Sequence, residues 1–216
     1  NDVGIYYVTF TFINFLPIIL KSINRIFAPI ISEIWEQKNI KELQTLYYFF
    51  TKWSLILSFP LVFFVVLFNE DLMLLFGPDF VSGKRVLIIL AIAHSIGIMF
   101  GSVRTILQMT DKHINIFWVE VFRTLFVVIL MCVLVPKYKM DGAAFALGSG
   151  IIINNIINYF ILYKHIKIKP YKKDFWKIIM FIVLTSTILI IFFGLLSNVI
   201  MISHWYWMVF SMLLIF

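Results

Sequence analysis

Five charged side chains interrupt the long apolar runs of this sequence, and four of the five are cationic. They are Lys21, Arg25, Arg104, Glu120 and Arg123. Charged groups in such runs are costly, and they usually face a protein interior or a water-filled cavity. Arginine can bind phosphate oxygens through a two-pronged fork of hydrogen bonds, whereas lysine acts as a point charge. These residues are therefore the candidate binding groups of the protein.

Lys21 and Arg25 are four residues apart, so they share one face of a helix. Asn14 continues this face, together with Thr11 and Ile18. We predict that this polar face turns away from lipid and lines a cavity. The alternative is that the two long side chains reach along the helix to water at its end. That alternative suits Arg25 better than Lys21, which lies roughly 16 Å from the expected helix end.

Glu120 and Arg123 are three residues apart, and the interpretation we favour is an ion pair within one helix. The alternative is that Glu120 is a proton- or cation-binding carboxylate whose pKa is set by Arg123. Arg104 lies about five residues from the end of its helix, so we expect it to reach for water there. Gln108 follows one turn later, and Gly97 with Gly101 predicts a seam of close helix packing.

The composition predicts an integral membrane protein. Hydrophobic residues make up 62% of the 216 residues, charged residues only 13%, and the mean hydropathy is +0.99. A soluble domain is nearer half apolar and a quarter charged, so no water-soluble fold is expected. The net charge of +7 does not indicate nucleic-acid binding, because the lysine clusters adjoin apolar segments.

Continuous apolar runs of about 20 residues predict transmembrane α-helices. We place them at 5–31, 46–68, 85–109, 114–135, 142–163 and 175–196, with a seventh that begins near 204. The predicted fold is an all-α, polytopic bundle of about seven helices. Pro17 and Pro60 are expected to kink the first two. Because the chain starts and stops beside or within apolar runs, we expect a fragment of a longer protein.

Lysine and arginine in the loops predict the orientation, since cytoplasmic loops carry an excess of them. The loops 33–52, 110–113 and 164–177 hold ten lysines, against four lysines and arginines in 69–85, 136–141 and 197–203. We therefore predict that the first set is cytoplasmic. The densest cluster, 164–173, is interpreted as a topology determinant that contacts anionic lipid headgroups.

An ordered set of short segments then resembles a known family. The segments are Ala28-Pro29-Ile30-Ile31-Ser32, Leu74-Leu75-Phe76-Gly77-Pro78-Asp79-Phe80, Gln108-Met109-Thr110-Asp111-Lys112, Leu134-Val135-Pro136-Lys137-Tyr138 and Asp141-Gly142-Ala143-Ala144. Their order and spacing over about residues 1–170 are similar to the C-terminal half of polysaccharide or O-antigen-type flippases of the multidrug/oligosaccharidyl-lipid/polysaccharide exporter superfamily. The resemblance implies that 1–165 is the C-terminal lobe, helices eight to twelve. It also implies that 166–216 adds two helices, the last truncated.

The resemblance further implies a multi-pass transporter of the bacterial cytoplasmic membrane. Such proteins flip undecaprenyl-pyrophosphate-linked oligosaccharide repeat units, as in lipopolysaccharide synthesis, through a cavity between two lobes. Its partners would be that substrate, the bilayer and a missing N-terminal lobe. Lys21 and Arg25 would then bind the pyrophosphate, Arg104 and Arg123 would be further cavity cations, and Asn14, Glu120 and Gln108 polar or coupling groups of the cavity.

Two other functions remain open from the sequence. One is a cation-coupled multidrug exporter of the same superfamily, for which Glu120 is the candidate acid. The other is a membrane-embedded glycosyltransferase or acyltransferase. We favour a protein that is not an enzyme, because the loops are short and lysine-rich. The sequence shows no nucleophile–base pair, no glycine-rich phosphate loop and no metal-ligand spacing. We therefore expect no cofactor.

Three asparagines lie in one of the later apolar runs. Asn154, Asn155 and Asn158 predict hydrogen bonds between helices.

Overall fold

The computed structural model describes residues 2–171 together with 180, 184 and 187, and the part it describes is helical without strands. The elements are α1 (Asp2–Ile13), α2 (Ile18–Glu36), α3 (Ile40–Leu67), α4 (Asn69–Leu74), the 3-10 helix η1 (Pro78–Gly83), α5 (Lys84–Met99), α6 (Val103–Met109) and α7 (His113–Ile166). This architecture confirms the predicted all-α polytopic membrane fold. The two helices expected after residue 175 lie outside the described residues.

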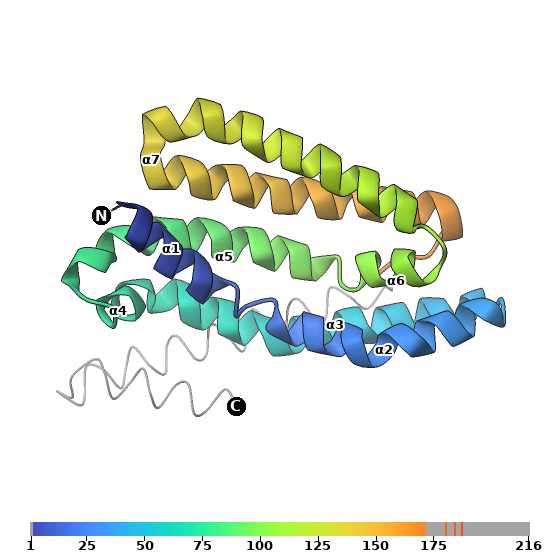
Figure 1. Cartoon of the computed structure of the whole chain (residues 1–216). Coiled ribbons are helices and arrows are strands. Elements are labelled where there is room, and N and C mark those ends of the chain that lie inside the picture. The colour runs from blue at the N-terminus through green and yellow to red at the C-terminus, as the bar shows by residue number, and fades with distance from the viewer. Residues whose placement is uncertain (1, 172–179, 181–183, 185–186, 188–216) are drawn as a thin grey trace.

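Three helical stretches of the described residues are long and apolar enough to cross a membrane, or four if the bent pair α1 and α2 forms one span. The three are α3, Pro78–Met99 and α7. With 54 residues, a straight α7 would extend about 81 Å, far more than a bilayer. It turns back on itself at Lys139, whose backbone is not helical (φ 47°, ψ −123°) (Figure 1). Its two limbs correspond to the helices predicted at 114–135 and 142–163.

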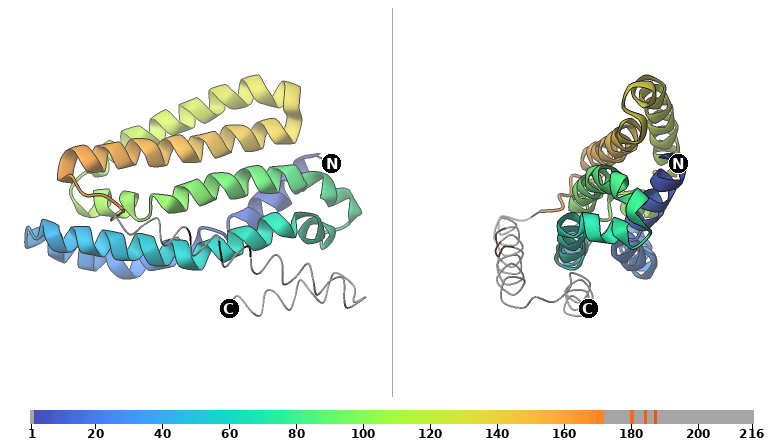
Figure 2. Two further views of the ribbon diagram at one scale, coloured as in Figure 1. Left: turned by 180° about the vertical axis from the view of Figure 1, so that it is seen from behind. Right: turned by 90° about the vertical axis from the view of Figure 1, so that its left-hand side faces the viewer.

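The central helix of the bundle is α5. It packs against α7 on one side and against α1 and α3 on the other, as two views of the molecule show (Figures 1 and 2). Val86, Leu87, Leu90 and Ala91 of α5 are fully buried. They belong to one apolar cluster, and a second cluster around Tyr47 and Leu107 lies where α2, α3, α6 and the end of α7 meet.

The prediction of one continuous helix over residues 5–31 is wrong. The segment consists of two helices, α1 and α2, bent by 45° across residues 14–17. Proline has no amide hydrogen to donate and its ring crowds the preceding turn, so the regular helix stops before Pro17 and restarts after it. Pro60, by contrast, lies inside the continuous helix α3.

The prediction of a loop over residues 33–52 is also wrong for most of that range. The α2 helix continues to Glu36 and α3 begins at Ile40, so that only a three-residue turn separates them. Asn39 caps α3, because its side-chain oxygen accepts a hydrogen bond from the Glu42 amide at 3.3 Å. Most of the polar residues in this range therefore lie in the last turn of α2 and the first turns of α3.

The predicted helix 85–109 breaks at Gly101, which has a left-handed backbone (φ +63°). Gly97 and Gly101 consequently do not form one packing seam. A Cβ atom on Gly97 would lie 3.2 Å from the Asn155 amide nitrogen on α7, whereas one on Gly101 would crowd the Thr51 side chain on α3, 3.0 Å from its Cβ. Each glycine therefore lets its backbone pack closely against another helix, Gly97 against α7 and Gly101 against α3.

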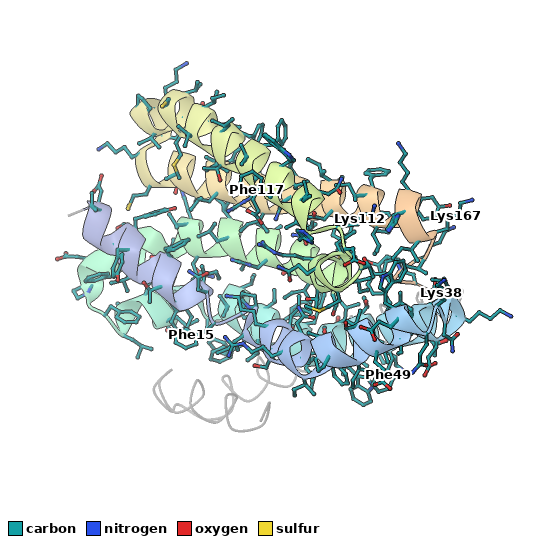
Figure 3. All side chains as sticks on the ribbon, turned by 45° about the vertical axis from the view of Figure 1, so that its right-hand side comes forward. Phe15, Lys38, Phe49, Lys112, Phe117 and Lys167 are labelled. Carbon is teal, nitrogen blue, oxygen red and sulfur yellow. The ribbon has the colours of Figure 1, made fainter. Side chains whose placement is uncertain are left out.

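The described loops of the two predicted sets lie at opposite ends of the bundle, while 172–177 and 197–203 lie outside the described residues. The lysine-rich end holds the turn between α2 and α3, the turn before α7 and the end of α7 (Figure 1). The side-chain view labels Lys38 and Lys167 at this end, with Lys112 nearer the middle of the molecule (Figure 3). The lysine-poor end holds α4, η1 and the turn at Lys139. This separation agrees with the predicted topology, and the assignment of the lysine-rich end to the cytoplasm stays a prediction.

Single-cysteine labelling tests that assignment. In a Cys132→Ser background, we expect Lys169→Cys to resist a membrane-impermeant maleimide in intact cells and to react once the membrane is opened. Lys137→Cys, at the opposite end, should react in intact cells. The reverse pattern would show that the orientation is inverted.

A second prediction concerns the break at Gly101. Gly101→Ala should lower the free energy of unfolding by at least about 1–2 kcal/mol, because an L-residue is strained at this φ and its Cβ meets Thr51. The measurement is unfolding in mixed detergent micelles. Gly4→Ala is the matched control, because a Cβ atom at this position on α1 would have no neighbour within 4 Å, and alanine is the better helix former. Equal stability of the two variants would contradict the assigned break.

Candidate functional site

Glu120 lies where three helical segments meet. It belongs to the first limb of α7, and Arg123, one turn later, donates from Nε to Glu120 Oε2 at 2.8 Å. Arg104 of α6 donates from Nη1 to Glu120 Oε1. Asn154, on the second limb of α7, donates from Nδ2 to the same oxygen at 3.3 Å. We call Arg104, Glu120, Arg123 and Asn154 the Glu120 cluster.

The ion pair expected between Glu120 and Arg123 is therefore present. Arg104, which we expected to reach for water at its helix end, pairs with this carboxylate as well, because α6 packs against α7. A guanidinium gains more from a charge-assisted hydrogen bond to a carboxylate than from a neutral partner. Figure 1 shows α6 beside the start of α7, which is the arrangement that brings the two together.

Asn154 is the member of the cluster whose role the sequence only partly predicts. Among the described residues, Asn155 bonds the Ile151 carbonyl of its own helix at 2.9 Å, and Asn158 donates to Asn154 Oδ1 at 3.2 Å. Of the three asparagines expected to bond between helices, Asn154 does so, by linking the two limbs of α7. Asn158 is only 2% exposed and orients Asn154 toward Glu120.

The cluster carries a net positive charge, since two arginines surround one carboxylate. The exposed fractions of the side chains are 23% for Glu120, 33% for Arg123 and 52% for Arg104. Arg104 therefore has guanidinium hydrogens that face outward from the described bundle. An anionic group that approached this surface would meet hydrogen-bond donors that are still available.

Lys21 and Arg25 form a second, separate group on α2. Both side chains are exposed, and among the described residues neither makes an ion pair with a carboxylate. Lys21 lies near enough to His94 of α5 for the two side chains to interact electrostatically. The sequence does not reveal this neighbour, because nothing in the pattern of either helix relates two residues so far apart along the chain.

The expected polar face does not run along one helix. Asn14 lies in the break between α1 and α2, where its Nδ2 bonds the Phe10 carbonyl at 2.7 Å. Gln108 is exposed on α6, which packs against α2. The structure thus brings the helix of Lys21 and Arg25 against the helix of Arg104 and Gln108, although no hydrogen bond between described residues joins the two groups.

Several helical stretches that are long and apolar enough to cross a membrane define a multi-pass membrane protein. The MatE family model matches residues 1–134, more than half of the chain, and the chain therefore belongs to the MatE family. This family is part of the multidrug/oligosaccharidyl-lipid/polysaccharide exporter superfamily, so the protein is of a transporter family and not an enzyme family. No curated protein matches the chain. The matched region contains Lys21, Arg25 and the Glu120 cluster except Asn154.

The contacts of the Glu120 cluster predict how strongly three alanine variants should be destabilised relative to one another. Glu120→Ala should lower the free energy of unfolding by about 3 kcal/mol, because it leaves two arginines unpaired in an apolar setting. Arg123→Ala should cost less, since Arg104 still neutralises Glu120. Ser149→Ala on the second limb of α7, which removes hydroxyl bonds to nearby carbonyls, should cost about 1 kcal/mol or less. Unfolding in mixed micelles measures all three, and a Glu120→Ala loss no larger than that of Ser149→Ala would refute the cluster.

Proposed function

We propose that this protein flips undecaprenyl-pyrophosphate-linked oligosaccharide repeat units across the bacterial cytoplasmic membrane for polysaccharide export, as in O-antigen synthesis. Membership of the MatE family supports transport by the multi-pass bundle. The substrate is our inference from the sequence resemblance and from the charges on α2. A lipid pyrophosphate is anionic and must cross a region of low dielectric, where an unpaired charge costs many kcal/mol.

The observation that carries the proposal is the pair Lys21 and Arg25. The two residues are one turn apart on α2, exposed, and without an ion-pair partner among the described residues. Cations that only stabilise a fold are generally neutralised by nearby carboxylates, as Arg123 is by Glu120. Cations left unneutralised on a membrane helix suit an anionic ligand that arrives during transport. Arg25 offers a fork to the phosphate oxygens and Lys21 a point charge.

In the proposal, groups on α6, which packs against α2, extend the binding surface of Lys21 and Arg25. Arg104 retains outward-facing donors, and Arg123 keeps the cluster net positive. Gln108 and Asn14 add side-chain amides near these helices. In the proposal, the cations bind the pyrophosphate and the amides bind sugar hydroxyls.

The cation-coupled drug exporter is the competing function within the same superfamily. It needs a carboxylate that is free to bind a proton or metal cation. Glu120 is the candidate, but its two oxygens already accept bonds from Arg104, Arg123 and Asn154. A carboxylate held between two arginines attracts cations weakly, because the local charge is already positive. This geometry favours the flippase.

The proposal includes a second lobe of helices that faces α2. Two exposed cations in a membrane-spanning helix would otherwise meet hydrocarbon, which is unfavourable by several kcal/mol or more. A facing lobe encloses them in a cavity that water and substrate can enter.

Substitution of the two cations tests the substrate assignment. Lys21→Ala and Arg25→Ala, made in the complete protein, should abolish or severely reduce flipping, because the pyrophosphate loses its neutralising charges. Lys21→Arg should be tolerated better than Lys21→Ala, because it keeps the charge. The measurement is polysaccharide output in a flippase-null strain, with the amount of protein in the membrane quantified alongside.

Lys38→Ala is the matched control, because Lys38 is an exposed cation in the turn just after α2 and outside the expected cavity. It should leave output unchanged. Full output from the double variant Lys21→Ala/Arg25→Ala would overturn the assignment. Loss of drug resistance, without loss of polysaccharide, would favour the drug exporter.

A further inference from the structure

A third group of charged residues lies apart from the proposed binding site, at the lysine-poor end of the bundle. The turn of α7, the start of α1 and the start of α5 come together there, as the view from behind shows (Figure 2). A cavity of about 410 Å³ opens between them, and its walls include Asp2, Lys84, Arg85, Tyr138, Lys139 and Asp141.

The charges in this cavity are balanced and loosely paired. Arg85 Nη1 lies 3.8 Å from Asp141 Oδ2, and Lys139 Nζ lies 3.9 Å from Asp2 Oδ2. Both distances exceed hydrogen-bond length, so the donors and acceptors of these four groups are not used up by each other. Arg85 and Lys139 are 76% and 80% exposed, which leaves them open to a ligand. The ammonium of Lys84, by contrast, contacts Glu70.

Two apolar grooves adjoin the cavity and share its walls. One, of about 310 Å³, is lined by Ile89, Leu134 and Phe145 and shares Tyr138 and Asp141 with the cavity. The other, of about 370 Å³, is lined by Val3, Tyr6, Val135 and Ala143 and shares Asp2 and Lys139.

Each groove lies deeper in the bundle than the charged cavity. In one groove, Ile89 and Phe145 are one helical turn, about 5.4 Å, from Arg85 and Asp141 along their helices. In the other, Tyr6 and Val135 are one turn from Asp2 and Lys139. Phe145 is 58% exposed, as expected of a side chain that faces lipid. The order from the end of the bundle inward is therefore charged cavity, then two apolar grooves. A phospholipid has the same order, with one headgroup and two acyl chains.

We propose that this end of the protein binds one phospholipid whose headgroup carries a phosphate and a primary ammonium group. The phosphate binds Arg85 and Lys139, the ammonium binds Asp141 and Asp2, and one acyl chain lies in each groove. A headgroup with an unbalanced negative charge fits less well, because the two carboxylates repel it. A quaternary ammonium group fits less well because it has no hydrogen to donate to them. This site is independent of the proposed function.

The test measures which lipids stay bound. The full chain is reconstituted in nanodiscs with equal amounts of phosphatidylethanolamine, phosphatidylglycerol and phosphatidylcholine, then extracted in mild detergent. Native mass spectrometry identifies the retained lipid, and we expect phosphatidylethanolamine to be preferred. Arg85→Gln and Asp141→Asn should each reduce its retention about tenfold, as expected from the loss of a charge-assisted hydrogen bond.

Lys137→Gln and Asp79→Asn are the matched controls, because both residues are exposed at the same end but line none of these three cavities. They should retain the lipid as the unaltered chain does. The double variant Arg85→Gln/Asp141→Asn removes one whole charge pair, so it leaves no unpaired partner and should fold; circular dichroism checks this.

Three results would overturn the proposal. The first is equal retention by the double variant and the controls. The second is a preference for phosphatidylglycerol, or no preference over phosphatidylcholine. The third is displacement of the bound lipid by an equimolar lipid pyrophosphate, which would make the cavity an exit site for the transported substrate.

Discussion

Hydrocarbon offers no hydrogen-bond partner, so each charge and each broken helical turn in the membrane-spanning part of this bundle must be satisfied by the protein itself or by water. The structure meets this requirement in one place and leaves it open in another. Glu120 accepts hydrogen bonds from three donors, which come from α6 and from both limbs of α7. Lys21 and Arg25 have no carboxylate partner among the described residues, which is why they stand apart as ligand-binding candidates.

The same requirement explains where the helices break. At residues 14–17 local backbone hydrogen bonds, such as those from Phe15 to Phe12 and from Leu16 to Ile13, close the turn, whereas at Gly101 the backbone leaves the helical path beside Thr51 of α3. The Phe100 carbonyl beside the second break accepts a hydrogen bond from the Tyr47 hydroxyl at 2.8 Å, and the Tyr171 hydroxyl bonds the Met99 carbonyl. Side chains of α3 and of the segment after α7 thus satisfy backbone groups that an unbroken helix would have bonded itself.

The sequence predicted the features that depend on nearby residues. The apolar runs, the ion pair between Glu120 and Arg123 and the separation of two loop sets follow from composition and from spacing along one helix. It did not predict the partners of Arg104 or Asn154, because Glu120 lies 16 and 34 residues away from them and only the packing of α6 and the two limbs brings them together. The break at Gly101 was missed for a similar reason, since a glycine within an apolar run is compatible with a continuous helix until a neighbour such as Thr51 is placed against it.

The bend between α1 and α2 divides the first span into two parts with different neighbours. The main contacts of α1 are with α5, η1 and α7, whereas those of α2 are with α3 and α6. The joint between them is the four residues 14–17. Lys21 and Arg25 lie on α2, beyond this joint, so α3 and α6 position the two candidate cations, whereas α5, η1 and α7 position α1.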